Sequence, residues 1–155
     1  MIATDHCSFD FHGDKQNGKD DFTKCPNGAP GVETRMPIVF SEGVSKGRLS
    51  LNEFAAVTST NPAKIFGMYP KKGVLAPGSD ADIVLMNPDM EVTITKNILH
   101  ENVDYTPYEG IQVKGWPVMT MVRGQAVVEN ERLQVPLGFG RYINRKPVKY
   151  TELLK

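Results

Sequence analysis

The sequence opens with a short apolar run that ends in an acid, an imidazole and a thiol, residues 2–7 (Ile-Ala-Thr-Asp-His-Cys). The run is typical of a strand, and its abrupt end places Asp5 just past the strand's carboxyl end, where α/β barrels carry their catalytic groups. Asp is also a common turn-capping residue, and these six residues taken alone favour that simpler role. The rest of the chain decides between the two interpretations.

The position of this run is unusual. A domain usually begins with a polar and flexible lead-in, whereas here a candidate functional acid stands at position 5. We therefore expect the chain to begin within a larger fold. Its 155 residues, with 40% hydrophobic and 23% charged residues, have the composition of a globular domain.

Charge and cysteine content exclude several classes of protein. The 18 Lys and Arg balance the 18 Asp and Glu, which argues against nucleic-acid and anionic-membrane partners. No apolar run approaches the roughly 20 residues of a membrane span, and no signal peptide follows Met1. Cys7 and Cys25 are the only cysteines, too few for a disulfide framework and without the spacing of a zinc motif. We expect reduced thiols and a cytoplasmic location.

Residues 8–31 predict one long loop, because they hold four Gly, two Pro and no sustained period. Loops of this length are usually functional or disordered, and the three phenylalanines in the loop favour function. Within it, Pro26-Asn27-Gly28 has the composition of a turn that can present backbone N–H and C=O groups to a ligand. A plain surface turn is the alternative, and it is favoured on general grounds.

Residues 32–67 have helical spacing. Pro37 must lie in a first turn or produce a kink. Ser50 and Glu53 form a capping box that predicts a helix start. A second short helix is predicted to open with Asn61 as its cap and Pro62 in its first turn, and to close at Gly67.

From Lys71 onward the pattern becomes extended. Strands are predicted in the segments 83–86, 92–95, 118–122 and 126–129, with Asn87-Pro88 ending the first and a glycine turn at Arg123-Gly124-Gln125 joining the last two. Four strands expose two edges, so we expect partner strands from elsewhere, as in part of a β-sandwich. Residues 133–155 have little periodicity and predict either an arm that lies on a neighbour or a frayed tail.

Six stretches of the sequence, in this order and at about this spacing, resemble the C-terminal third of the dihydropyrimidinase and hydantoinase family of cyclic amidohydrolases. They are residues 4–7, 18–22, 26–35, 58–67, 78–82 and 102–110. The Asn-Pro-Ala-Lys and Gly-Ser-Asp-Ala-Asp motifs recur across the wider amidohydrolase superfamily. The Pro-Asn-Gly-Ala-Pro-Gly loop and the Asp-Tyr-Thr-Pro-Tyr-Glu-Gly block are specific to the narrower family.

The resemblance implies an α/β fold, incomplete as given. Residues 1–70 would be the last strand, active-site loop and closing helices of a (β/α)₈ metallohydrolase barrel. Residues 71–132 would form part of a β-sandwich with an inserted loop near 97–116, and residues 133–155 a C-terminal arm that reaches a neighbouring subunit in a homotetramer.

The resemblance also implies a site. Family enzymes hold two divalent metal ions, typically zinc, and Asp5 corresponds to the aspartate that binds one metal and acts as general base and then general acid. That role is chemically reasonable, because a metal lowers the pKa of its water and a carboxylate can take and return the proton. Asn27 corresponds to the position whose backbone holds the cyclic amide or imide edge of the substrate. For His6 and Cys7 the resemblance implies no ligand role.

Most of the family's metal ligands are absent from this sequence. It has three histidines, no His-x-His pair and no counterpart of the carboxylated lysine, whereas zinc takes about four ligands. We expect the missing part of the enzyme, or another chain, to supply them. The alternatives are a non-catalytic relative such as the collapsin response mediator proteins, a stand-alone interaction module, and an allantoinase or dihydroorotase. Retention of Asp5 and Asn27 favours the enzyme.

Overall fold

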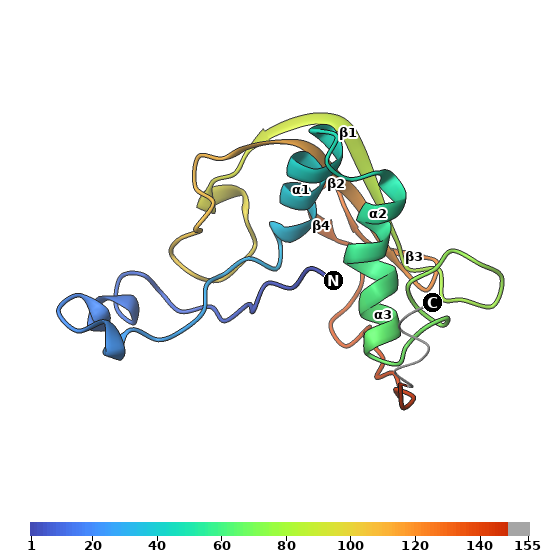
Figure 1. Cartoon of the computed structure of the whole chain (residues 1–155), viewed down its shortest axis with the longest axis horizontal. Helices are drawn as coiled ribbons and strands as arrows, with labels where there is room; N and C mark the ends of the chain where they lie inside the picture. The colour runs from blue at the N-terminus through green and yellow to red at the C-terminus, as the bar shows by residue number, and fades with distance from the viewer. Residues whose placement is uncertain (149–155) are drawn as a thin grey trace.

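A computed structural model describes residues 1–148 of the chain; residues 149–155, the end of the predicted arm, lie outside the described part. The second half forms an antiparallel sheet whose strands lie in chain order (Figure 1). The strands are β1 (Ile83–Thr93), β2 (Gln112–Val122), β3 (Gln125–Glu129) and β4 (Arg132–Leu133). Arg123 and Gly124 both have positive φ, as a two-residue hairpin turn requires, so the predicted hairpin is confirmed.

Strand β1 corrects one prediction. It continues through Asn87-Pro88 instead of ending there, with a shift of register between Asn87 and Glu91. Proline is tolerated because β1 is an edge strand in the described residues, so Pro88 can lack an N–H without breaking the sheet. The connection from β1 to β2 is therefore residues 94–111, shorter than the predicted loop at 97–116.

Three short α-helices precede the sheet: α1 (Arg35–Val39), α2 (Leu51–Ala55) and α3 (Asn61–Ile65). Pro37 is the third residue of α1 and so lies in the first turn of that helix, as predicted. The capping box is confirmed, since the Ser50 side chain accepts from the N–H of Glu53 and the Glu53 carboxylate accepts from the N–H of Ser50. Figure 1 shows α2 and α3 as one continuous helical column.

The segment α3 begins at Asn61 as predicted, but the cap role predicted for Asn61 is wrong. A π-helical segment, Ala56–Thr60, joins α2 to α3, and Thr60 already has helical backbone angles. Asn61 is therefore inside the helix, where its side chain has no free first turn to cap. The predicted end is confirmed: the N–H of Gly67 binds the carbonyl of Lys64, and Gly67 has a φ of +67°.

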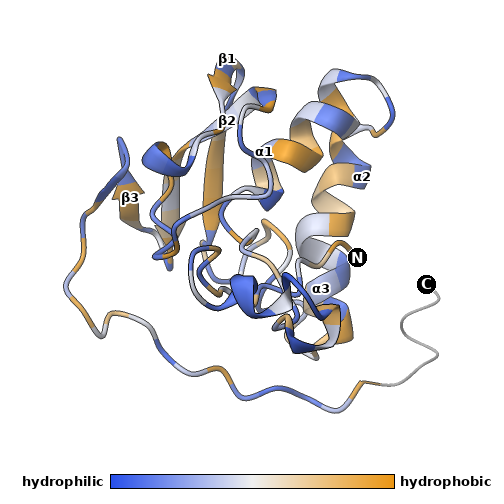
Figure 2. Cartoon of the chain, turned by 90° about the vertical axis from the view of Figure 1, so that its left-hand side faces the viewer, coloured by the Kyte–Doolittle hydropathy of each residue, from blue (hydrophilic) through white to orange (hydrophobic). Residues whose placement is uncertain are grey.

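The hydrophobic core lies between β2, the segment that follows β1, and the helices. Its centre consists of Ile94, Leu99, Val113 and Trp116. The rings of Phe40 and Phe54 pack edge to face at 5.4 Å and extend the core into the helices. Gly115, with a φ of +103°, lies against the ring of Phe40, where no side chain would fit. In Figure 2, α1 is seen between β2 and α2, and all three carry apolar (orange) stretches.

The Gly-Ser-Asp-Ala-Asp motif ties the start of the sheet to the turn before it. Asp80 forms ion pairs with Lys71 at 2.8 Å and Lys72 at 2.9 Å, and Asp82 pairs with Lys72. The other oxygen of Asp82 accepts the N–H of Arg123 at 2.9 Å. The motif therefore holds the hairpin turn beside the start of β1.

The strand expected at residues 2–5 is not formed. A strand needs a neighbour to bond to, and within the described residues this segment has one backbone bond, from the N–H of Ile2 to the carbonyl of Val57 at 3.0 Å. A single parallel bridge joins His6 and Ala29. Figure 1 shows the first thirty residues running outward from the helices and the sheet.

The sheet presents apolar side chains that this chain leaves uncovered. Val84, Leu85 and Leu133 are 40%, 45% and 62% exposed. Among the described strands β1 and β4 each have one unpaired edge. Exposed apolar surface beside open strand edges is what a missing covering element leaves behind. No helix within residues 1–148 is long and apolar enough to cross a membrane.

The segment after β4, residues 134–148, runs extended from the sheet toward α3 (Figure 2). Contacts at three places attach it to its own chain. Next to β4, the N–H of Gln134 binds the carbonyl of Val127 at 2.9 Å. The guanidinium of Arg123 donates to the carbonyl of Phe139 at 2.8 Å and lies 4.5 Å from the centre of its ring. The N–H of Lys146 binds the carbonyl of Gly67 at 3.0 Å. This part of the predicted arm is therefore fixed at both ends.

Candidate functional site

Asp5 does not act as the cap of a turn within the described residues. Its φ is +46°, in the left-handed region that Asp tolerates but most residues avoid. The residue is exposed, and its carboxylate accepts no hydrogen bond from any described residue. A capping aspartate would accept a nearby backbone N–H. The carboxylate thus has no partner among the described residues, and its role in a site stays a prediction.

His6 anchors the segment on which Asp5 stands. Its Nδ1 accepts the backbone N–H groups of Gly31 at 3.1 Å and Val32 at 3.3 Å. Nδ1 therefore carries no hydrogen, and the ring proton sits on Nε2. The carboxylate of Glu101 lies 3.7 Å from the same nitrogen, but two acceptors do not form an ion pair. His6 acts as a structural acceptor that fixes the loop beside Asp5.

The loop that carries Asn27 is docked on the residue after His6. The N–H of Cys7 binds the carbonyl of Ala29 at 3.4 Å. Gly28, with a φ of +101°, packs against the Cys7 side chain so closely that no Cβ would fit. The turn predicted at Pro26-Asn27-Gly28 is wrong: this stretch has no turn or bend and runs past Cys7. Asn27 is exposed, and its N–H and C=O have no partner in the described residues.

Lys15 binds this loop from the opposite side. Its ammonium donates to the carbonyl of Pro26 and, at 2.6 Å, to the carbonyl of Gly28. It also lies 5.6 Å from the centre of the Phe9 ring. The two carbonyls flank Asn27, so Lys15 holds the chain on either side of that residue.

The family-specific block at residues 104–110 holds the start of the long loop. The carboxylate of Asp104 accepts the N–H of Phe11 at 2.6 Å and the N–H of His12 at 2.8 Å. The N–H groups of His12 first, and then Phe11, lower the pKa of Asp104 below its ordinary value. The rings of Phe11 and Tyr105 lie 5.7 Å apart, and burial raises the pKa of Tyr105. The block therefore places the loop as well as marking the family.

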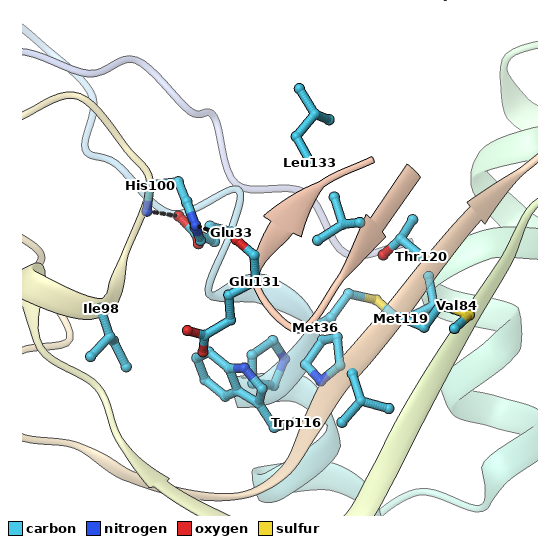
Figure 3. Close-up of a pocket in the computed structure, with 14 residues that line it drawn as sticks. Glu33, Met36, Val84, Ile98, His100, Trp116, Met119, Thr120, Glu131 and Leu133 are labelled. Carbon is cyan, nitrogen blue, oxygen red and sulfur yellow. Dashed lines mark hydrogen bonds and ion pairs between the residues drawn. The ribbon is translucent and has the colours of Figure 1, made fainter. Parts of the chain in front are cut away.

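A second anchor joins Glu33 to the segment after the core. One oxygen of Glu33 accepts the backbone N–H of His100 at 2.8 Å, and the other lies 2.7 Å from Nδ1 of the His100 ring. This bond from Glu33 raises the pKa of His100 above its ordinary value. Glu101 accepts the N–H of Glu33 in return, at 3.2 Å. Figure 3 shows the bonds between Glu33 and His100 as dashed lines.

A cavity of about 490 Å³ lies below this anchor, between α1 and the sheet. Its lining is mostly apolar and includes Met36, Ile98, Trp116 and Met119 (Figure 3). Asp5 and Asn27 do not line it. The cavity is thus separate from the predicted site, and its lining includes Val84 and Leu133, two of the exposed side chains of the sheet.

Comparison with known proteins reveals the family. The model of the amidohydrolase family matches residues 1–127. The chain belongs to the amidohydrolase family. It is 47% identical over 153 residues to a D-hydantoinase of Geobacillus stearothermophilus and 46% identical over 147 residues to a D-phenylhydantoinase of Escherichia coli. These alignments cover 99% and 95% of this chain but 32% of each relative.

Solved structures agree with this assignment. A dihydropyrimidinase from Brevibacillus agri is 50% identical and superposes with a TM-score of 0.93, over 96% of this chain and 32% of that one. A D-hydantoinase from a Bacillus species gives the same TM-score at 46% identity. This amidohydrolase chain thus spans about a third of the length of the relatives it matches, and its fold is part of theirs.

Amidohydrolases are typically metal-dependent, so the described residues must be tested for a metal site. In residues 1–148, no group of three or more His, Cys, Asp or Glu side chains could hold a metal ion. The Asp5 carboxylate offers at most two oxygens where about four ligands are needed. Residues 1–148 of this amidohydrolase chain do not by themselves form the metal centre.

Several residues that build the site were not singled out by the sequence. Lys15 lies in a loop without periodicity, and Asp104 is one position of a block recognised only as a family signature. Glu33 and Glu101 contact each other across 68 positions of sequence. A pattern confined to neighbouring residues carries no signal for such pairs.

Proposed function

We propose that this chain is part of a metal-dependent cyclic amide hydrolase that opens dihydropyrimidines or 5-substituted hydantoins. The names of its relatives, D-hydantoinase, D-phenylhydantoinase and dihydropyrimidinase, support this substrate class. The observation that carries the proposal is the free carboxylate of Asp5, held in a left-handed conformation beside the docked segment of Asn27.

In the proposed reaction, Asp5 moves one proton twice. Its carboxylate takes a proton from a water molecule as the water oxygen bonds to the amide carbon of the ring. It then returns the proton to the ring nitrogen as the C–N bond breaks, which leaves a carboxylic acid and a free ureido end. The backbone of Asn27 holds the amide edge of the ring through its N–H and C=O groups. His6 and Lys15 keep the two segments in place.

The rest of the enzyme follows from the same proposal. We infer that residues 1–70 complete the end of a (β/α)₈ barrel and that residues 71–132 belong to a β-sandwich. Two divalent metal ions, zinc in the family pattern, would be held mainly by side chains outside the described residues, among them a carboxylated lysine. A homotetramer and a cytoplasmic location belong to the same proposal, and the uncovered sheet face supports an additional covering element.

A chimera tests the proposal. Residues 1–155 would replace the matching third of the Geobacillus stearothermophilus D-hydantoinase, and hydrolysis of dihydrouracil and a 5-substituted hydantoin would be measured. We expect turnover by the chimera and none by the isolated chain, even with added zinc. A chimera that folds and binds zinc without turnover would contradict the proposal, and so would metal-dependent turnover by the isolated chain.

A further inference from the structure

The side chain of Lys15 is held at three points although it comes from an otherwise irregular loop. Its ammonium donates to the carbonyls of Pro26 and Gly28 and lies near the ring face of Phe9. The hydrogen bonds that a charged ammonium donates to two carbonyls are stronger than those of a neutral donor in the same place. The contacts span 11 and 13 positions of sequence, so they join the start of the long loop to its end.

These contacts determine which way the peptide groups around Asn27 face. The peptide between Pro26 and Asn27 is trans, so its C=O and N–H point in opposite directions. Because the Pro26 carbonyl faces Lys15, the N–H of Asn27 faces away from Lys15. The C=O of Asn27, like its N–H, has no partner among the described residues. Lys15 thus occupies the flanking carbonyls and leaves one donor and one acceptor of Asn27 free.

We propose that Lys15 is a positioning residue for substrate binding in this enzyme. By fixing the carbonyls on both sides of Asn27, it presents the N–H and C=O of that residue as a preformed pair. The amide edge of a cyclic substrate offers the complementary pair, one C=O and one N–H side by side. This inference rests on the proposed function, and it assigns to Lys15 a role in the binding of substrate and none in proton transfer.

The kinetic test compares three variants in the chimera. Lys15→Met keeps the length and apolar stem of the side chain but removes the donors. We expect it to raise KM for the hydantoin about tenfold while kcat stays within about threefold, because the lost contact serves ground state and transition state alike. Lys15→Arg keeps the charge and should recover part of the loss. Lys19→Met, at an exposed lysine of the same loop, is the matched control and should leave KM unchanged.

A second measurement needs no activity. The contacts of Lys15 with the carbonyls of Pro26 and Gly28, here called the Lys15 clamp, hold the end of the long loop in place. Hydrogen exchange at the amides of Gly31 and Val32, which bind His6, should therefore become faster in Lys15→Met but not in Lys19→Met. An unchanged exchange rate would overturn the clamp itself. An unchanged KM in Lys15→Met would overturn the positioning role. A variant that loses both kcat and thermal stability, and is not rescued by Lys15→Arg, would overturn it as well. If the parent chimera shows no turnover, the proposed function fails, and the exchange rates still decide the clamp.

Discussion

The loop region (residues 1–34) and the sheet region (residues 35–133) are held together by different forces. Among the described residues, eight buried hydrophobic side chains form the core between Phe40 and Trp116, whereas the buried side chains of the loop region are those of Pro30 and Thr34. The loop region is fixed instead by polar contacts, such as those of Asp104 and Lys15. Burial makes a stable platform, whereas polar contacts place a segment and leave its side chains exposed. Asp5 and Asn27, the two predicted site residues, both lie in the loop region and are exposed.

The largest expected effect lies in the loop region. Asp5→Asn in the chimera should lower kcat by about 10²–10⁴-fold, the usual value of general acid–base assistance. The unfolding midpoint of the metal-free chimera should not change, because the carboxylate has no partner in the described residues. Steady-state kinetics and urea denaturation check both points. Asp20→Asn, at another exposed acid of the loop, is the control; near-normal turnover by Asp5→Asn would remove Asp5 from the mechanism.

The sheet region should show the opposite behaviour. Trp116→Ala should destabilise the chimera by about 3–5 kcal/mol, because it removes a large buried ring from the core. Phe22→Ala, whose ring is 85% exposed in the loop region, should change stability by less than about 0.5 kcal/mol. Urea denaturation of both variants measures the difference. Equal losses would show that the loop region is also held by burial.

The connection between the two regions should be sensitive to Asp104. Asp104→Asn should speed hydrogen exchange at the amides of Phe11 and His12 on the order of tenfold. The lowered pKa of Asp104 gives the pH dependence: the contact is fully present above about pH 4 and is lost as the pH falls through the lowered value. If hydrogen exchange at the amides of Phe11 and His12 has the same rate with Asp or Asn at position 104, the Asp104 carboxylate does not anchor the loop.

The smallest effect should come from His100. Its pKa is raised by Glu33, so the stabilising contact is complete below pH 6.5 and fades as the pH rises through the raised value. The side chain of His100 is 64% exposed, so the contribution should stay below about 1 kcal/mol. The free energy of unfolding, measured from pH 5 to 9, should fall as the pH rises above 6.5, and His100→Gln should remove this decrease. A slope of the opposite sign would contradict the Glu33 contact.

Local signals in the sequence predicted local structure well. The capping box at Ser50 and the hairpin turn at Arg123-Gly124 each depend on residues within a few positions, and both are confirmed. The passage of β1 through Pro88 could not be predicted in the same way. It depends on β1 being an edge strand, which is a property of the assembled sheet.

The site could be predicted only in part, for the same reason. The carboxylate of Asp5 at the end of an apolar run is by itself a weak signal, and the resemblance to the family singled out both Asp5 and Asn27; their roles stay predictions. The strand expected before Asp5 did not form, because within the described residues it has no neighbouring strand to bond to. Asp104 reaches Phe11 across 93 positions of sequence, so only the folded chain reveals that contact.

The central claim is that substrate binds in the loop region and not in the apolar cavity of the sheet region. A crystal structure of the chimera with a bound 5-substituted hydantoin tests it most directly. We expect the amide edge of the ring to hydrogen-bond to the N–H and C=O of Asn27. The Asp5 carboxylate should lie within about 3.2 Å of the atom that gives or receives the proton, or one water away. A ring bound in the cavity beside Trp116, with Asp5 and Asn27 free, would contradict the claim.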